Sequence, residues 1–157
     1  MKTRKALIFV IGLLLLTTLA AGAHLLTREQ VTEGTVQLIY GEKTYELEIS
    51  ELEYEKVTGT RRNGKGEEIL VESSGILLKD VLERKGIVEY SKVKVVSDDS
   101  YSAELTAEEV ENDTKAYLLH EKEGELRLVV FGDTNSKRSV SNVVQIIVEF
   151  EKSHNMV

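Results

Sequence analysis

Alternating apolar and polar positions mark much of the chain beyond residue 34. In "TVQLIYGEKTYELEI", Thr35–Ile49, apolar residues recur at every second position on both sides of Gly41-Glu42-Lys43. A period of two is typical of a half-buried strand, and a glycine turn between two such runs predicts a β-hairpin. The same reasoning predicts strand, turn, strand over Lys56–Ser73, with the turn at Asn63–Gly66.

Further strands are predicted where the alternation returns later in the chain. They cover Ser91–Ser97, Lys115–Glu121, Glu125–Gly132 and Ser139–Phe150. Only residues 122–124 separate the second of these from the third, so we expect the two to form a hairpin. The pattern therefore indicates about eight strands.

Helical spacing is rarer and the predicted helices are short. Within Ser73–Gly86 four apolar residues lie at i, i+1, i+4 and i+5, which places them on one helix face, and Gly86 is suited to the position after the last turn. Thr106 with Glu109 predicts a capping box that opens a helix through about Asn112, and Ser50 with Glu53 predicts another. Many strands with two or three short helices, not in strict alternation, indicate an α+β fold.

The first 26 residues differ from the rest of the chain. Three basic residues within Met1–Lys5 precede the apolar run Ala6–Leu26, which is typical of a secretory signal. The run is also long enough to span a bilayer. We therefore expect residues 1–26 to be a signal peptide or an N-terminal hydrophobic helix that anchors the chain in the membrane. Residues 27–34 are a predicted linker, 35–150 the domain and 151–157 a tail. Either reading predicts an extracytoplasmic location, secreted or membrane-anchored.

Charge and composition limit the classes of partner that the segment after residue 26 can bind. Without its three N-terminal basic residues the chain has 17 Lys and Arg against 27 Asp and Glu, a net charge of −10. Such an acidic domain is unsuited to nucleic acid and to anionic lipid headgroups. The chain has no cysteine, so a disulfide and a thioether-linked lipid anchor are both excluded. Any contact with the membrane is expected through the N-terminal segment.

Some polar residues suggest chemistry but have a simpler structural explanation. Asp98 and Asp99 could bind a divalent cation, yet an Asp pair before Ser-Tyr-Ser more often forms an Asx turn. We expect Tyr101 to pack its ring in the core and to bond its hydroxyl to the backbone. His120 has no partners at metal-ligand spacing, so we predict no metal site.

Clustered positive charge is the strongest candidate for a binding site. Arg61, Arg62 and Lys65 lie in one segment and Lys137 and Arg138 in another, within an otherwise acidic domain. Guanidinium groups hold phosphate or carboxylate well. The two segments could therefore hold a small anionic ligand, and the alternative is solvated loop charge.

Three blocks of sequence carry a resemblance to a known superfamily. They are "GILLKDVLERKGI", "VVSDDSYSAELTAEEV" and "AYLLHEKEGELRLVVFGDTNSKRSVSNVVQIIV". In order and spacing they resemble the sulfite-oxidase-type molybdopterin-binding domain superfamily, over roughly residues 40–149. Each block alone has low specificity, and their common order carries the resemblance. It implies an α+β domain built around a mixed β-sheet.

The residues that serve the cofactor in that superfamily are not matched here. Its catalytic members bind molybdenum through a pterin dithiolene and one cysteine thiolate, a soft ligand for a soft metal centre. That cysteine would fall near Val57–Gly64, where this chain has none. Gly124 and Glu125 stand where a histidine often precedes the last block, and Ser141 replaces an expected lysine. The resemblance also implies that Arg61, Arg62, Lys137 and Arg138 lie near the cofactor cleft.

Two functions follow as expectations. The missing thiolate favours an exported, non-catalytic binding or interaction module, without a cofactor, whose partner is a protein or a small anionic ligand. The alternative is a molybdopterin-binding oxidoreductase component that holds an anionic cofactor through Arg61, Arg62, Lys137 and Arg138 without a cysteine ligand. No catalytic residue is predicted in either case, and the enzyme question stays open with the missing thiolate favouring no.

Overall fold

A computed structural model of the chain describes residues 34–112, 115–121 and 124–150. Contacts divide the chain into two units, Met1–Gln30 and Val31–Val157, and every described residue belongs to the second. The predicted signal or anchor and the predicted tail lie outside the described residues. Within the described ranges, no helix has both the length and the hydropathy that a bilayer span requires.

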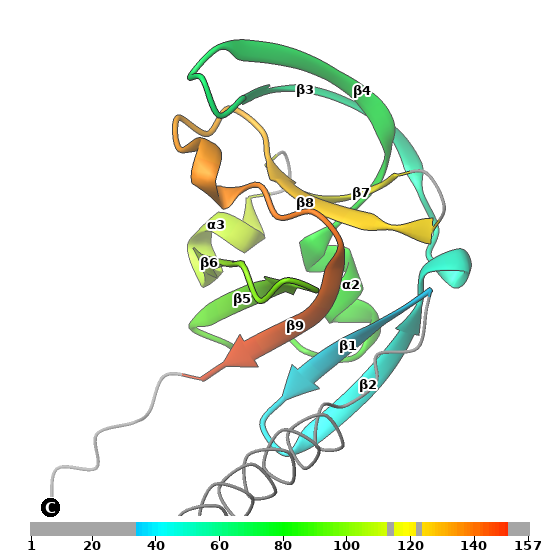
Figure 1. Cartoon of the computed structure of the whole chain (residues 1–157). Helices are drawn as coiled ribbons and strands as arrows, with labels where there is room; N and C mark the ends of the chain where they lie inside the picture. Colours follow the sequence, from blue (N-terminus) through cyan, green and yellow to red (C-terminus); the bar gives the residue numbers. More distant parts are fainter. Residues whose placement is uncertain (1–33, 113–114, 122–123, 151–157) are drawn as a thin grey trace, which may run out of the picture. The chain divides into compact units, whose positions relative to one another are not determined.

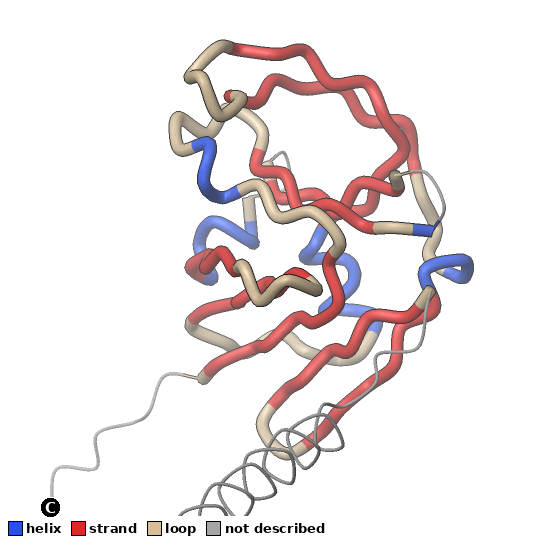
Figure 2. Tube along the Cα trace, viewed as in Figure 1, coloured by secondary structure: helices blue, strands red, loops and turns tan. Residues whose placement is uncertain are grey.

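Five strands form the first sheet, in the order β2-β1-β9-β5-β6 (Figures 1 and 2). They are β1 (Thr35–Tyr40), β2 (Lys43–Glu48), β5 (Lys92–Ser97), β6 (Ser102–Thr106) and β9 (Val143–Glu149). β1 and β9 pair in parallel, with Leu38 opposite Ile146, and the other neighbours are antiparallel. Alternate residues of β1 and β5 are buried, as the period of two predicts.

Four antiparallel strands form the second sheet, in the order β3-β4-β7-β8. They are β3 (Glu55–Arg62), β4 (Glu68–Leu77), β7 (Ala116–His120) and β8 (Leu126–Val130). The β3–β4 hairpin is long and arches over β7 and β8 (Figure 1). The end of β3 lies beside the residues that follow β8, and there the Gly132 N–H donates to the Thr60 carbonyl at 2.8 Å.

Local capping interactions explain where α2 ends and where α3 begins. α2 (Leu78–Arg84) is followed by Gly86 at φ +72°, and the N–H groups of Gly86 and Ile87 donate to Glu83 and Leu82, a Schellman C-cap. α3 (Ala107–Glu111) begins with the capping box predicted for Thr106 and Glu109. α2 lies between the two sheets in Figure 1.

One hydrophobic core joins both sheets and both helices. It contains Leu38 and Ile146 from the first sheet, Leu118 and Leu128 from the second, and Leu82 of α2. A second, smaller cluster lies under the arch of the β3–β4 hairpin and includes Val57 and Phe131. The arch is thus held to the remainder of the second sheet by its own apolar contacts.

The prediction of an α+β fold on one mixed β-sheet is wrong. The described residues form a predominantly β structure with two separate sheets, and their two α-helices have only seven and five residues. One reason is that β4 continues through Leu77, so the apolar run that predicted a helix over Ser73–Gly86 is divided between a strand and a short helix. Another is β6 (Ser102–Thr106), where no strand was predicted.

A smaller prediction near the first hairpin is also wrong. Ser50 lies inside the 3₁₀ turn η1 (Ile49–Glu51), whose N-cap is Glu48 and which has no side-chain cap hydrogen bond. The nearby Tyr54 hydroxyl instead donates to the Ile49 carbonyl at 2.7 Å. Glu53 pairs with Arg84 of α2 rather than closing a capping box.

Candidate functional site

Three of the four arginines and lysines predicted to bind a cofactor meet in space. Arg61 and Arg62 end β3, and Arg138 ends the 3₁₀ turn η3 (Ser136–Arg138); all three line one recess of about 10 Å³. Asp133 and Ser139 also line it. We call this the arginine recess. Lys137 is not among its lining residues, and its backbone carbonyl accepts a hydrogen bond from the Tyr101 hydroxyl.

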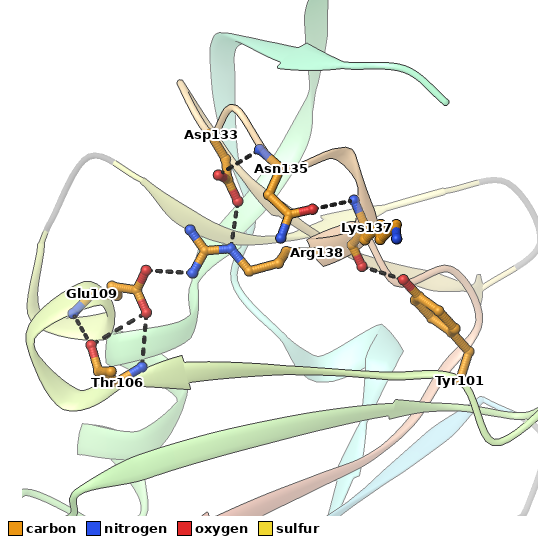
Figure 3. A network of polar contacts seen from close by, with 7 residues as sticks. All are labelled: Tyr101, Thr106, Glu109, Asp133, Asn135, Lys137 and Arg138. Atoms are coloured by element: carbon orange, nitrogen blue, oxygen red, sulfur yellow. Dashed lines mark hydrogen bonds and ion pairs between the residues drawn. The ribbon is translucent and has the colours of Figure 1, made fainter. Parts of the chain in front are cut away.

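The loop that places Arg138 is ordered by side-chain to backbone hydrogen bonds. Asp133 Oδ1 accepts from the Asn135 N–H at 2.9 Å, and Asn135 Oδ1 accepts from the Lys137 N–H at 3.1 Å (Figure 3). Short polar side chains that satisfy nearby N–H groups in this way stabilise tight turns. They fix the start of η3 and thereby the direction of the Arg138 side chain.

Arg138 lies between two carboxylates (Figure 3). Its Nε donates to Asp133 Oδ2 at 2.6 Å, and its Nη1 donates to Glu109 Oε1. These hydrogen bonds raise the pKa of Arg138 above its ordinary value. Burial acts to raise the pKa of Glu109 and of Asp133, but the bonds from Arg138 and from backbone N–H groups outweigh it, so both pKa values are lowered.

Glu109 is held in place from its other side by the cap of α3. Its Oε2 accepts from the Thr106 N–H at 2.9 Å, while the Thr106 hydroxyl accepts from the Glu109 N–H at 3.3 Å. The capping box therefore orients the carboxylate that reaches Arg138. One guanidinium with two ionised carboxylates leaves this triad with a net charge of −1, so Arg138 supplies no excess positive charge to an anion.

A larger pocket of about 260 Å³ adjoins the arginine recess across the Arg138–Asp133 pair. It lies between α3 and the segment after β8, and we call it the polar pocket. Its charged lining residues are Glu108, Glu109, Lys115, Asp133 and Arg138. Three carboxylates against two cations give its lining a net negative charge.

A pterin cofactor fits neither space. The arginine recess has room for about one water-sized group, whereas pockets for drug-sized ligands and cofactors hold about 300–1,000 Å³. The polar pocket approaches that size, but its three carboxylates would repel the phosphate of the cofactor. Among the described residues no three His, Cys, Asp or Glu side chains cluster as a metal site would require.

The remaining candidates of the sequence are structural. Asp99 Oδ1 accepts from the Tyr101 N–H at 2.9 Å, which confirms the Asx turn. Tyr101 bonds its hydroxyl to the backbone as predicted, but its ring is 44% exposed, so the prediction that it packs in the core is wrong. His120 stacks on Tyr54 with 4.9 Å between ring centroids.

Sequence reasoning missed the residues that decide the electrostatics of the site. Glu109 was predicted only as part of a helix cap, and no role was predicted for Asp133. Glu109 and Arg138 are 29 residues apart, and no spacing rule links positions so distant. Ser139 was missed as well, since nothing distinguishes its hydroxyl from those of other loop serines.

Comparison with protein-family models finds no match for this chain. A comparison with curated proteins finds no match either.

Proposed function

We propose that the chain is an exported, non-catalytic binding module, secreted or anchored by its N-terminal segment, which contacts a partner through the polar pocket and its rim. One observation carries the proposal: Arg138, a member of the predicted cofactor-binding set, is bonded to Glu109 and Asp133. A cation that two carboxylates already satisfy is a poor anchor for an anionic cofactor, because binding would first have to break those bonds.

The polar pocket supports a binding role by its chemistry. Fixed carboxylates, an ammonium group and a guanidinium group offer several polar contacts within one pocket. A polar segment of another protein, or a small polar ligand, matches such a lining.

The alternative, a molybdopterin-binding oxidoreductase component, gains no support from the geometry. The arginine recess is too small for a pterin and the polar pocket has the wrong charge for its phosphate.

Single-cysteine cross-linking tests the proposal, since the natural chain has no cysteine. Thr134 lines the polar pocket and Glu72 is exposed on the outer part of β4. Thr134→Cys and Glu72→Cys, each in the full chain, are labelled in the native host with a photoactivatable maleimide. We expect a discrete cross-linked partner from position 134 and not from position 72.

Two results would count against the binding module. The first is the same cross-linked pattern from both positions, or from neither. The second is the failure of a membrane-impermeant maleimide to label Thr134→Cys in intact cells freed of their wall, which would contradict the extracytoplasmic location.

A further inference from the structure

The Ser139 hydroxyl is a buried polar group without a hydrogen-bond partner among the described residues. Ser139 lines the arginine recess, which has room for about one water-sized group. A buried hydroxyl left without a partner destabilises the folded state, so such groups are rare in folded proteins and call for an explanation. The recess beside it offers that explanation.

Two guanidinium groups line the same recess. The Arg61 side chain has no hydrogen bond or ion pair within residues 34–112, 115–121 and 124–150, and the Arg62 side chain donates to the Gly66 carbonyl at 3.3 Å. Arg61 is half-buried, and the alternation of β3 places it on the same face as Gly59, under the arch. Glu68 lies opposite Arg62 across the β3–β4 pair, on the other face of the hairpin.

The geometry points to a binding site for one small anion, a halide or a single oxygen of an oxyanion, held by the Arg61 guanidinium and the Ser139 hydroxyl. From these two side chains only donors are available, because a guanidinium has no acceptor and a serine hydroxyl can turn to donate. The Asp133 carboxylate also lines the recess, but its oxygens already accept from Arg138 and from the Asn135 N–H. Arg138 closes the recess but keeps its bonds to Asp133 and Glu109. The site is independent of the proposed binding function.

A bound anion would tie two distant segments together. Arg61 and Arg62 belong to the arch, and Ser139 follows η3, which precedes β9 of the first sheet. The backbone of the arch is joined to the end of β8 by the bond from the Gly132 N–H to the Thr60 carbonyl. A bound anion would therefore add a polar contact that holds the arch to the segment before β9.

Thermal unfolding of the full chain tests the site. The protein is held at constant ionic strength while gluconate, which is too large for the recess, is replaced by chloride, bromide or phosphate. At ten times the Kd of the bound anion we expect the Tm to rise by about 3–6 °C. Stabilisation by halide alone identifies a monatomic occupant, and stabilisation by phosphate alone identifies an oxyanion.

Variants separate binding from a general salt effect. Arg61→Gln and Ser139→Ala should abolish the anion-dependent rise. Ser139→Ala should also be at least as stable as the natural chain in gluconate, because it removes an unsatisfied hydroxyl. Arg84→Gln removes an arginine whose exposed ion pair with Glu53 lies elsewhere, and it should keep the full rise.

Two outcomes would overturn the inference. One is an equal Tm in gluconate, chloride, bromide and phosphate, which would show that water and not an anion occupies the recess. The other is the same anion-dependent rise in the natural chain, Arg61→Gln and Ser139→Ala. Crystals of the full chain soaked in bromide supply a second readout, and an anomalous peak between Arg61 and Ser139 is the expected result.

Discussion

At the scale of single residues, the close approach of Gly59 and Phe131 shows why a glycine is required inside a strand. A Cβ atom at position 59 would lie 2.4 Å from the Phe131 ring, well inside van der Waals contact. The ring also contacts Tyr117, with 5.4 Å between centroids, so it has little freedom to move. The smaller hydrophobic cluster under the arch depends on this pair.

Gly59→Ala should therefore destabilise the protein by about 1–3 kcal/mol, because the new methyl group overpacks the small cluster. The free energy of unfolding, measured by urea denaturation, checks the effect. Gly64→Ala is the matched control, since its Cβ would meet nothing within 4 Å. Equal stability of the two variants would contradict the packing described for Phe131.

The ionisation of the Tyr54 phenol gives a direct test of its burial. Burial raises its pKa from 10.0 to about 12. The folded state then favours the protonated phenol, so this contribution to stability is complete below pH 10 and is lost as the pH rises from 10 towards 12. Absorbance of tyrosinate at 295 nm, compared between the natural chain and Tyr54→Phe, should assign a group near pH 12. A difference spectrum that titrates near pH 10 would refute the burial of this ring.

At the scale of elements, α3 is too short to be stable alone and depends on its cap. A five-residue helix forms little more than one turn, so its unsatisfied N–H groups weigh heavily. Thr106→Ala should cost about 1 kcal/mol, within the usual range for an N-cap. Thr106→Ser keeps the acceptor oxygen and should restore most of the loss. Equal denaturation midpoints for Ala and Ser would show that the cap is not what holds α3.

The bonds between α3 and the loop before β9 predict a pH dependence. The lowered pKa values of Glu109 and Asp133 stabilise the folded state above their ordinary values of 4.5 and 3.8, and this stability is lost as the pH falls below them. Arg138→Gln should lower the free energy of unfolding at pH 7 by about 1–3 kcal/mol.

That difference should narrow as the pH falls from 7 through 4 towards 3, and denaturation at each pH measures it. Arg84→Gln, which removes an exposed pair with Glu53, should show a small difference throughout. A gap between Arg138→Gln and the natural chain that is constant with pH would contradict the ion-pair assignment.

Element by element, local pattern predicted what local contacts determine. Both ends of the first hairpin, the turn at Asn63–Gly66 and the Thr106 cap follow from spacing and turn chemistry, and the structure confirms them. β6 was missed because Ser102–Thr106 directly precedes a strong helix-start signal. The helix over Ser73–Gly86 was overestimated because pairing of Gly75–Leu77 with β7 outweighs a helical apolar pattern.

At the scale of the whole domain, the arrangement depends on pairings that no local pattern encodes. β1 lies beside β9 in parallel although about a hundred residues separate them. The division into two sheets around α2 follows from such long-range contacts. The sequence therefore predicted most strands but not the sheets in which they lie.

The candidate site, like the two sheets, is formed by contacts between residues that are far apart in the sequence. The arginines of the site were predicted from the clustering of charge. The carboxylates bonded to Arg138 were not predicted, because Glu109 and Asp133 reach it only after α3, β8 and η3 have packed together. The resulting triad has a net charge of −1, so Arg138 no longer contributes free positive charge to the predicted cationic cluster. That change in charge is the basis for proposing a binding module.

Molybdenum and pterin content is the most direct test of this account. The full chain, purified from its native host, would be analysed for molybdenum by mass spectrometry and for pterin by fluorescence after oxidation. A chain whose Arg138 is satisfied by Glu109 and Asp133 should contain less than about 0.05 molar equivalents of either. Molybdenum and pterin near one equivalent each, lost in Arg61→Gln and Arg138→Gln, would contradict it.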